Sequence, residues 1–162
     1  MIRTSHLFFI FFLFSSNAIS QNYWQQSVDY TMNVNIDVKT FQYNGKQKLI
    51  YSNNSPDTIH KVFYHLYFNA FKPGSEMASS IINAKDKNKR FSVDINTIPK
   101  NEEGRLTVSS LMQDGKPILS EYSGTILEVS LKNPLLPGKN TTLTLDFEGQ
   151  VPKMIRRAGR DS

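Results

Sequence analysis

A strict alternation of apolar and polar residues between positions 28 and 38 constrains the fold of this chain more than any other feature. Every even position in this stretch is apolar and every odd position is polar. A β-strand points successive side chains to opposite faces, so a period of two predicts a half-buried strand with one apolar face. Apart from the first residues, no segment shows helical spacing over an ordinary helix length. We therefore expect a protein built of strands.

The next segments continue this pattern with turn signals between them. The apolar positions change parity after residue 40, which requires a turn or bulge, so residues 43–52 are predicted to pair back on the first strand. Turn-forming residues at 53–57 close the second strand, and a third begins near His60. Residues 62–68 are apolar or aromatic at both parities, which predicts that this strand is covered on both faces and is the most buried one.

Strand signals resume in the second half of the chain. Residues 106–111 precede Asp114 and Gly115, a pair typical of a tight hairpin turn. Residues 118–122 and 126–131 are predicted to form the next strands. Pro134, Pro137 and Gly138 should then interrupt the sheet. A last strand places three apolar side chains inward, namely Leu143, Leu145 and Phe147. The predicted fold class is all-β, with antiparallel sheets of about seven or more short strands.

Between residues 72 and 104 the sequence makes a long polar excursion that is rich in lysine and asparagine. Met77, Ile81 and Ala84 lie at helical spacing behind Ser75, which could serve as an N-cap, so one short helix is predicted. Loops of this length are usually functional or mobile, and the sequence does not say which.

The first residues have the three parts of a secretory signal peptide. Arg3 supplies a positive charge, residues 7–14 form an apolar run, and residues 18–20 have the small-x-small pattern of a cleavage site before Gln21. An apolar run of this length is far shorter than the roughly 20 residues that a membrane span needs. We therefore expect a signal peptide at 1–20 and export to the periplasm or the extracellular space.

Composition limits what residues 21–162 can be. Removing 20 of the 162 residues leaves 142, enough for one domain or part of one. The formal net charge falls from +5 to +4 with the loss of Arg3, and the chain has no cysteine, which excludes disulfides, thiolate zinc sites and cysteine nucleophiles. The basic clusters at 85–90 and 153–160 contain no aromatic residues that could stack on bases, so we expect solvated loops and no nucleic-acid partner.

The expected mature chain also lacks a recognisable catalytic motif. A zinc hydrolase of the H-E-x-x-H type needs two histidines one helical turn apart, whereas His60 and His65 are five residues apart in a predicted strand, with no glutamate after either. Glu102 and Glu103 are adjacent in a polar stretch and read as solvated loop residues rather than as an acid/base pair. No G-x-S-x-G motif is present. We predict no catalytic, cofactor-binding or metal-binding residue.

Two short tripeptides match the acceptor for N-linked glycosylation. They begin at Asn53 and Asn140. Such tripeptides recur by chance and matter only in a host that glycosylates secreted proteins, so they carry little weight.

Five short stretches, in this order, resemble a known family. Their residues are 43–45 (Tyr-Asn-Gly), 63–71 (Phe-Tyr-His-Leu-Tyr-Phe-Asn-Ala-Phe), 106–111 ahead of Asp114 and Gly115, 124–129 (Gly-Thr-Ile-Leu-Glu-Val) and 147–152 (Phe-Glu-Gly-Gln-Val-Pro). Together they resemble the amino-terminal β domain of the aminopeptidase N-like zinc metallopeptidases, or gluzincins, especially the exported bacterial branch. The resemblance runs from about Trp24 to Ser162.

The resemblance implies a saddle- or sandwich-like antiparallel β domain that packs on a thermolysin-like catalytic domain. In that family, further strands, a T-Q motif, a G-x-M-E-N motif and the zinc helix follow, and this sequence ends before all of them. The resemblance therefore implies a partial domain that is inactive alone. Zinc and peptide substrate would belong only to the full-length enzyme, whose catalytic domain is the implied partner in cis.

Two functions stay open at this point. The first is the N-terminal scaffold portion of a secreted zinc aminopeptidase. The alternative is a free-standing secreted β-sandwich that binds carbohydrate or an envelope protein. A saddle domain without its final strands would expose sheet edge and apolar surface, so the first reading also predicts self-association.

Overall fold

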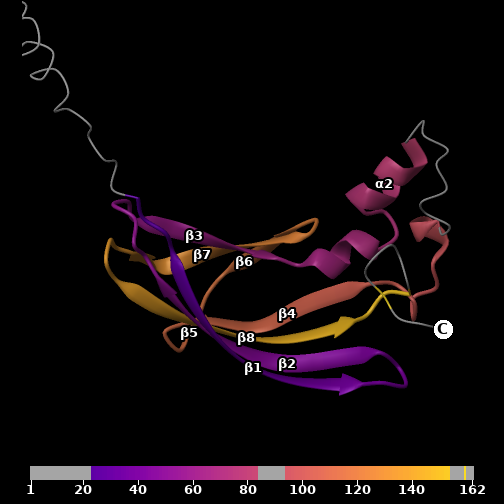
Figure 1. The fold of residues 1–162 in the computed structure, drawn as a ribbon, viewed down its shortest axis with the longest axis horizontal. Helices are drawn as coiled ribbons and strands as arrows, with labels where there is room; N and C mark the ends of the chain where they lie inside the picture. The colour runs from indigo at the N-terminus through magenta and orange to yellow at the C-terminus, as the bar shows by residue number, and fades with distance from the viewer. Residues whose placement is uncertain (1–22, 84–93, 154–158, 160–162) are drawn as a thin grey trace, which may run out of the picture.

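Two antiparallel sheets make up most of the structure (Figure 1). The computed structural model describes residues 23–83, 94–153 and 159. The larger sheet has the order β1-β2-β8-β4-β5 and the smaller one the order β3-β7-β6. The strands are β1 (Ser27–Asp37), β2 (Gln42–Ser52), β3 (Ile59–His65), β4 (Arg105–Gln113), β5 (Lys116–Pro117), β6 (Ser120–Ser123), β7 (Ile126–Leu135) and β8 (Asn140–Gln150). The predicted all-β antiparallel class is confirmed.

The core lies between the two sheets and comes mainly from alternate residues of the central strands. Leu127 and Val129 of β7 are fully buried against Leu143 and Leu145 of β8 and Leu49 of β2. Burying one such aliphatic side chain contributes about 1.5–3 kcal/mol. The predicted inward face of the last strand is therefore confirmed for Leu143 and Leu145.

The predicted turn between the first two strands is a hairpin loop. β1 and β2 pair without interruption from Ser27 opposite Ser52 to Asp37 opposite Gln42. Asp37 Oδ1 accepts from the main-chain N–H groups of Lys39 at 2.8 Å and Thr40 at 3.3 Å, and these hydrogen bonds hold the pKa of Asp37 below its usual range. Four residues lie between the strands, and this loop produces the change of parity seen in the sequence.

The hairpin predicted at Asp114 and Gly115 is also confirmed. Both residues have positive φ, 49° and 75°, as a two-residue turn with right-handed strand twist requires. The proline at 134 does not end the preceding strand, contrary to prediction, because β7 runs on to Leu135. The pairing of β7 with β3 is interrupted between Ser130 and Leu135. Pro134 lies in this gap, where no β3 residue is paired opposite it to accept the hydrogen bond that proline cannot donate.

The prediction that the third strand is the most buried one is wrong. Within β3 only Val62 is buried, Phe63 is 57% exposed, and the strand ends at His65, before the 3₁₀-helix η1 (Tyr67–Phe71). The two sheets form two layers, so only one face of β3 packs on the larger sheet. The other face is uncovered by any described residue, which is why its apolar residues remain exposed.

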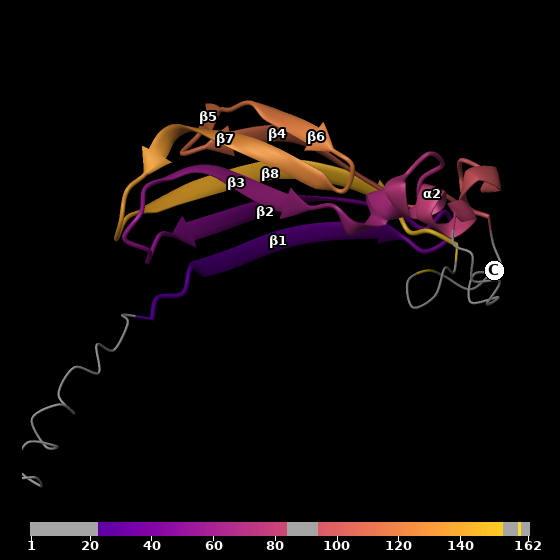
Figure 2. The same ribbon diagram turned by 90° about the horizontal axis from the view of Figure 1, so that it is seen from above.

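The first strand is less buried than its half-buried pattern predicted. Tyr30 and Ile36 are 57% and 65% exposed, although they lie on the apolar face. Figure 2 shows that the smaller sheet lies over β2, β8 and β4, whereas β1 forms the outer border. The apolar row of β1 therefore continues the core face but extends beyond the layer that covers it.

The polar excursion contains two short helices beside the open end of the sheets (Figure 1). They are α2 (Glu76–Asn83) and the 3₁₀-helix η2 (Ile95–Thr97), and they share a small core of Ala78, Ile95 and Ile98. Ser75 Oγ accepts from the N–H of Ala78 at 3.1 Å, which confirms the predicted N-cap. Ala84, the predicted signal peptide and the cluster at 85–90 lie outside the described residues. Within the described ranges, no helix has the length and apolarity to cross a bilayer.

Candidate functional site

The two histidines considered as metal ligands are both exposed on β3. His65 stacks on Tyr67 with ring centroids 5.4 Å apart, and His60 lies near the other end of the strand beside a bulge. Across residues 23–83 and 94–153, no three histidine, aspartate or glutamate side chains gather closely enough to hold a metal ion.

Glu102 and Glu103 are directed to different cations. Lys153 Nζ lies 3.3 Å from Glu102 Oε1, and Arg105 lies 4.0 Å from Glu103 Oε1. Each carboxylate therefore has its own basic neighbour, as in two separate structural ion pairs.

The first glycosylation tripeptide begins at a buried residue. Asn53 has no exposed surface, and its side chain is bonded to Gln26, Ser55, Asp57 and Leu135. In the folded protein this asparagine is closed to modification. Asn140, which begins the second tripeptide, is exposed at the start of β8.

A group of residues joined by hydrogen bonds and aromatic contacts lies where η1 meets the ends of β2, β4 and β8. We call this group the sheet-end cluster. Its members are Tyr43, Phe68, Asn69, Gly104, Arg105, Leu106, Phe147, Gly149 and Gln150.

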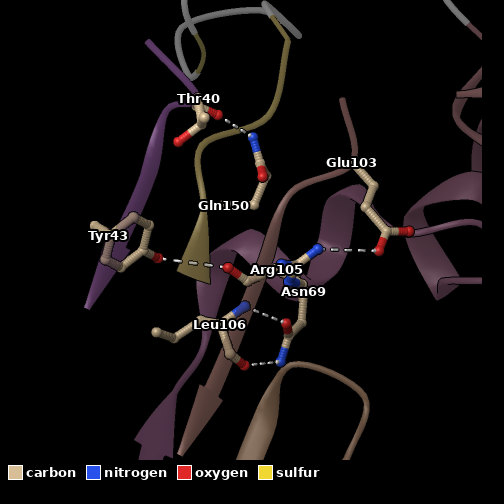
Figure 3. Close-up of polar contacts among 7 residues, drawn as sticks. All are labelled: Thr40, Tyr43, Asn69, Glu103, Arg105, Leu106 and Gln150. Atoms are coloured by element: carbon tan, nitrogen blue, oxygen red, sulfur yellow. Dashed lines mark hydrogen bonds and ion pairs between the residues drawn. The ribbon is translucent and has the colours of Figure 1, made fainter. Parts of the chain in front are cut away.

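Asn69 anchors η1 to the first residues of β4. Its Oδ1 accepts from the N–H of Leu106 at 2.9 Å, and its Nδ2 donates to the carbonyl of Leu106 at 3.1 Å (Figure 3). The side chain thus satisfies both main-chain groups of Leu106, as a neighbouring strand would. Asn69 is only 5% exposed, so these two bonds stabilise the position of η1 strongly.

Aromatic rings fill the space between η1 and the larger sheet. The ring of Tyr43 lies 6.1 Å from that of Phe68, edge to face, and 6.2 Å from that of Phe147. The Tyr43 hydroxyl points toward the carbonyl of Arg105 at 3.5 Å (Figure 3). Burial raises the pKa of Tyr43 to about 12, so this side chain is neutral at physiological pH.

Two glycines allow the rings of Phe147 and Tyr43 to lie directly against the backbone of the larger sheet. A Cβ on Gly45 would lie 2.6 Å from Phe147 Cζ, and a Cβ on Gly149 would lie 2.3 Å from Tyr43 Cζ. Both distances are shorter than atoms tolerate. Glycine is therefore required by space rather than by backbone conformation, since neither residue has a positive φ.

Gln150 ties the end of β8 to the loop between β1 and β2. The residue is 1% exposed, and its Nε2 donates to the carbonyl of Thr40 at 3.0 Å. The N–H of Val151 donates to the carbonyl of Phe41 at 3.0 Å in the same loop. Two bonds therefore close this end of the larger sheet.

Sequence reasoning did not single out Asn69 or Gln150. Both lie within stretches that resemble the family, but in the sequence each is a single polar residue in a strand-like run, and such a residue fits an exposed position equally well. What identifies both as structural is their burial together with main-chain partners in distant segments.

The five stretches that resemble the gluzincin family meet at this cluster or beside it. Stretches 43–45, 63–71, 106–111 and 147–152 each contribute a member. The fifth, 124–129, joins through the carbonyl of Thr125, which accepts from the N–H of Leu66 at 2.7 Å. Segments separated by as many as a hundred residues are thus brought into contact.

Comparison with known proteins finds matches among solved structures. No protein-family model matches the chain, and no curated protein matches it. An M1 zinc metallopeptidase from Deinococcus radiodurans is 15% identical with a TM-score of 0.49, and the match covers 78% of this chain and 20% of that one. A mutant of that enzyme, and a two-domain M1 zinc metallopeptidase mutant bound to L-arginine, give the same identity and TM-score, with 78% of this chain and 21% of theirs covered.

This chain therefore spans about a fifth of the length of the structures it matches. The likeness concerns the fold alone.

Proposed function

We propose that the chain is the N-terminal, non-catalytic scaffold portion of an exported zinc aminopeptidase. Cleavage of N-terminal residues from peptides then requires a catalytic domain in the same polypeptide. The observation that carries this proposal is the meeting of the five resembling stretches in and around the sheet-end cluster. Side chains that pack against one another must have complementary shapes. A packed junction therefore gives one structural reason for the resemblance of all five stretches.

The titratable groups support a structural role for this part of the enzyme. Among the described residues, every resolved shift moves a pKa further from neutral pH. The pKa of Asp37 is lowered, and the pKa values of Lys61, Tyr43, Tyr51 and Tyr64 are raised. The cause for the tyrosines is burial, and for Lys61 it is the hydrogen bond to Glu128. A general acid or base for peptide hydrolysis works best with a pKa near the working pH. The shifts of these groups come from burial, an ion pair and turn hydrogen bonds instead.

The reading frame beyond the codon for Ser162 tests the proposal. An in-frame H-E-x-x-H motif within a few hundred codons supports the scaffold role, because it would supply the missing zinc ligands. A stop codon with no such remnant would favour a free-standing secreted binding module. Export is tested separately, because an exported chain should begin at Gln21 when the product outside the cytoplasm is analysed by mass spectrometry.

A further inference from the structure

The outer edge of β1 is the longest unpaired strand edge among the described residues. β2 pairs one side of β1 over all eleven residues without a bulge, and no described strand pairs the other side. A free edge presents a row of unpaired N–H and C=O groups that can pair with another strand.

The other sheet edges carry features that discourage pairing, whereas β1 does not. β5 has two residues, one of them Pro117, and β6 has four. β3 has a bulge after Ile59 and an ion pair between Lys61 and Glu128. β1 contains neither proline nor lysine. Short strands, proline, lysine and bulges are among the usual protections of an edge, and β1 lacks these four; its charged residues, Asp29 and Asp37, lie on the polar face.

A partner for this edge must also match an apolar face. Tyr30, Met32 and Val34 are 57%, 48% and 46% exposed on the face that continues the core. Figure 2 shows β1 at the outer border of the larger sheet, with no described element beyond it. The best partner strand therefore carries apolar residues at alternate positions on the same face, as β1 itself does.

We propose that the outer edge of β1 pairs antiparallel with β1 of a second copy, about a two-fold axis at Met32. This register uses the whole strand, since Ser27 then faces Asp37 of the other copy. On the apolar face the facing pairs are Val28 with Ile36, Tyr30 with Val34, and Met32 with Met32. Pairs of an aromatic and a β-branched residue are among the stabilising cross-strand contacts.

Charge favours this register over its neighbour. With the axis at Met32, the carboxylate of Asp29 faces the amide of Asn35, which can donate to it. With the axis at Asn33, Asp29 would face Asp37 twice in each dimer, and like charges directly opposite are destabilising. One edge strand buries less surface than a standard interface, so the dimer should be weak, with dissociation in the micromolar range.

Sedimentation velocity tests the proposal on the exported product of the full 162-residue chain. The wild-type protein should shift from monomer to dimer between low and high micromolar concentration. Val34→Lys, which puts a charge on the paired face, should remain monomeric with an unchanged circular dichroism spectrum. Leu119→Lys is the matched control, because Leu119 is an apolar residue, 83% exposed, away from β1, and this variant should dimerise like the wild type.

Because the chain has no cysteine, single cysteines report the register without background. Under mild oxidation, Met32→Cys should give mostly cross-linked dimer and Asn33→Cys very little. Three results would overturn the proposal: a monomer at every concentration, which would mean that another partner covers this edge; association of Val34→Lys equal to the wild type; or preferential cross-linking of Asn33→Cys.

Discussion

The side-chain amide of Asn53 donates to the carbonyl of Leu135 at 3.0 Å, which joins the end of β2 to the end of β7 across 82 positions of the chain. The same nitrogen donates to the carbonyl of Asp57, and Oδ1 accepts from the N–H and the hydroxyl of Ser55. Asn53 has no exposed surface, so water cannot take its place as the hydrogen-bond partner of these groups. One residue thereby fixes the corner where the chain passes from the larger sheet to the smaller one.

Replacing this residue should be among the most destabilising changes in the protein. Asn53→Ala leaves several buried main-chain groups unpaired, and we expect it to lower the free energy of unfolding by about 2–4 kcal/mol. Asn54→Ala is the matched control, since Asn54 is exposed, and it should cost less than about 1 kcal/mol. Urea unfolding followed by circular dichroism measures both, and equal losses would show that Asn53 does not hold the corner.

Asn69 should control the attachment of η1. Asn69→Leu removes both bonds to Leu106, so the Leu106 amide should exchange with solvent faster and the protein should lose about 2–3 kcal/mol of stability. The same change at exposed Asn44 serves as the control and should leave the exchange of Leu106 unchanged. Native-state hydrogen exchange distinguishes the two outcomes, and protection of Leu106 that survives in Asn69→Leu would rule out the anchoring role.

Gly149 should not accept a side chain. In Gly149→Ala the new Cβ meets the Tyr43 ring, and we expect a loss of about 1–3 kcal/mol from overpacking. The double variant Gly149→Ala, Tyr43→Ala should lose less than the sum of the two single variants, because the clash with the ring is removed. Chemical unfolding of all four proteins gives this coupling, and strict additivity would argue against the contact.

Stability should fall at alkaline pH through Tyr43. Its pKa rises from the ordinary value of 10.0 to about 12 in the folded protein, so between these values the unfolded chain loses a proton that the folded chain keeps. The folded state then binds more protons, and stability decreases as pH rises, with no contribution below pH 10. Because the residue is only partly buried, the effect of Tyr43 should be on the order of 1 kcal/mol.

Comparison of unfolding at pH 9 and pH 11 measures this effect. The decline should be smaller in Tyr43→Phe than in the wild type. Tyr23→Phe, at a residue that is 89% exposed, should behave as the wild type does. An identical decline in all three proteins would mean that Tyr43 does not titrate with the folded state.

The sequence predicted the strands better than it predicted their burial. Period two placed β1, β2, β7 and β8 well, because alternation is a local property of an extended chain. Burial depends on which layer lies opposite, and no local pattern says that β3 is an edge strand or that β1 extends beyond the smaller sheet. Apolar residues at both parities of residues 62–68 were therefore misread as a fully covered strand.

The sheet-end cluster could be predicted only in part. The resembling stretches marked the right segments, but nothing in them indicated that Asn69 would bond to Leu106 or that Gly149 would lie against Tyr43. These contacts connect residues far apart in the sequence. Their geometry follows from the packing of η1 on the larger sheet and not from the spacing of residues along the chain.

The central proposal is that these residues support a zinc aminopeptidase without performing its chemistry. It is tested most directly by measuring bound zinc and aminopeptidase turnover on residues 21–162 of the chain, with zinc supplied and then with a chelator added. We predict no turnover above buffer and no zinc retained after gel filtration. Chelator-sensitive turnover accompanied by one zinc ion per chain would contradict the account.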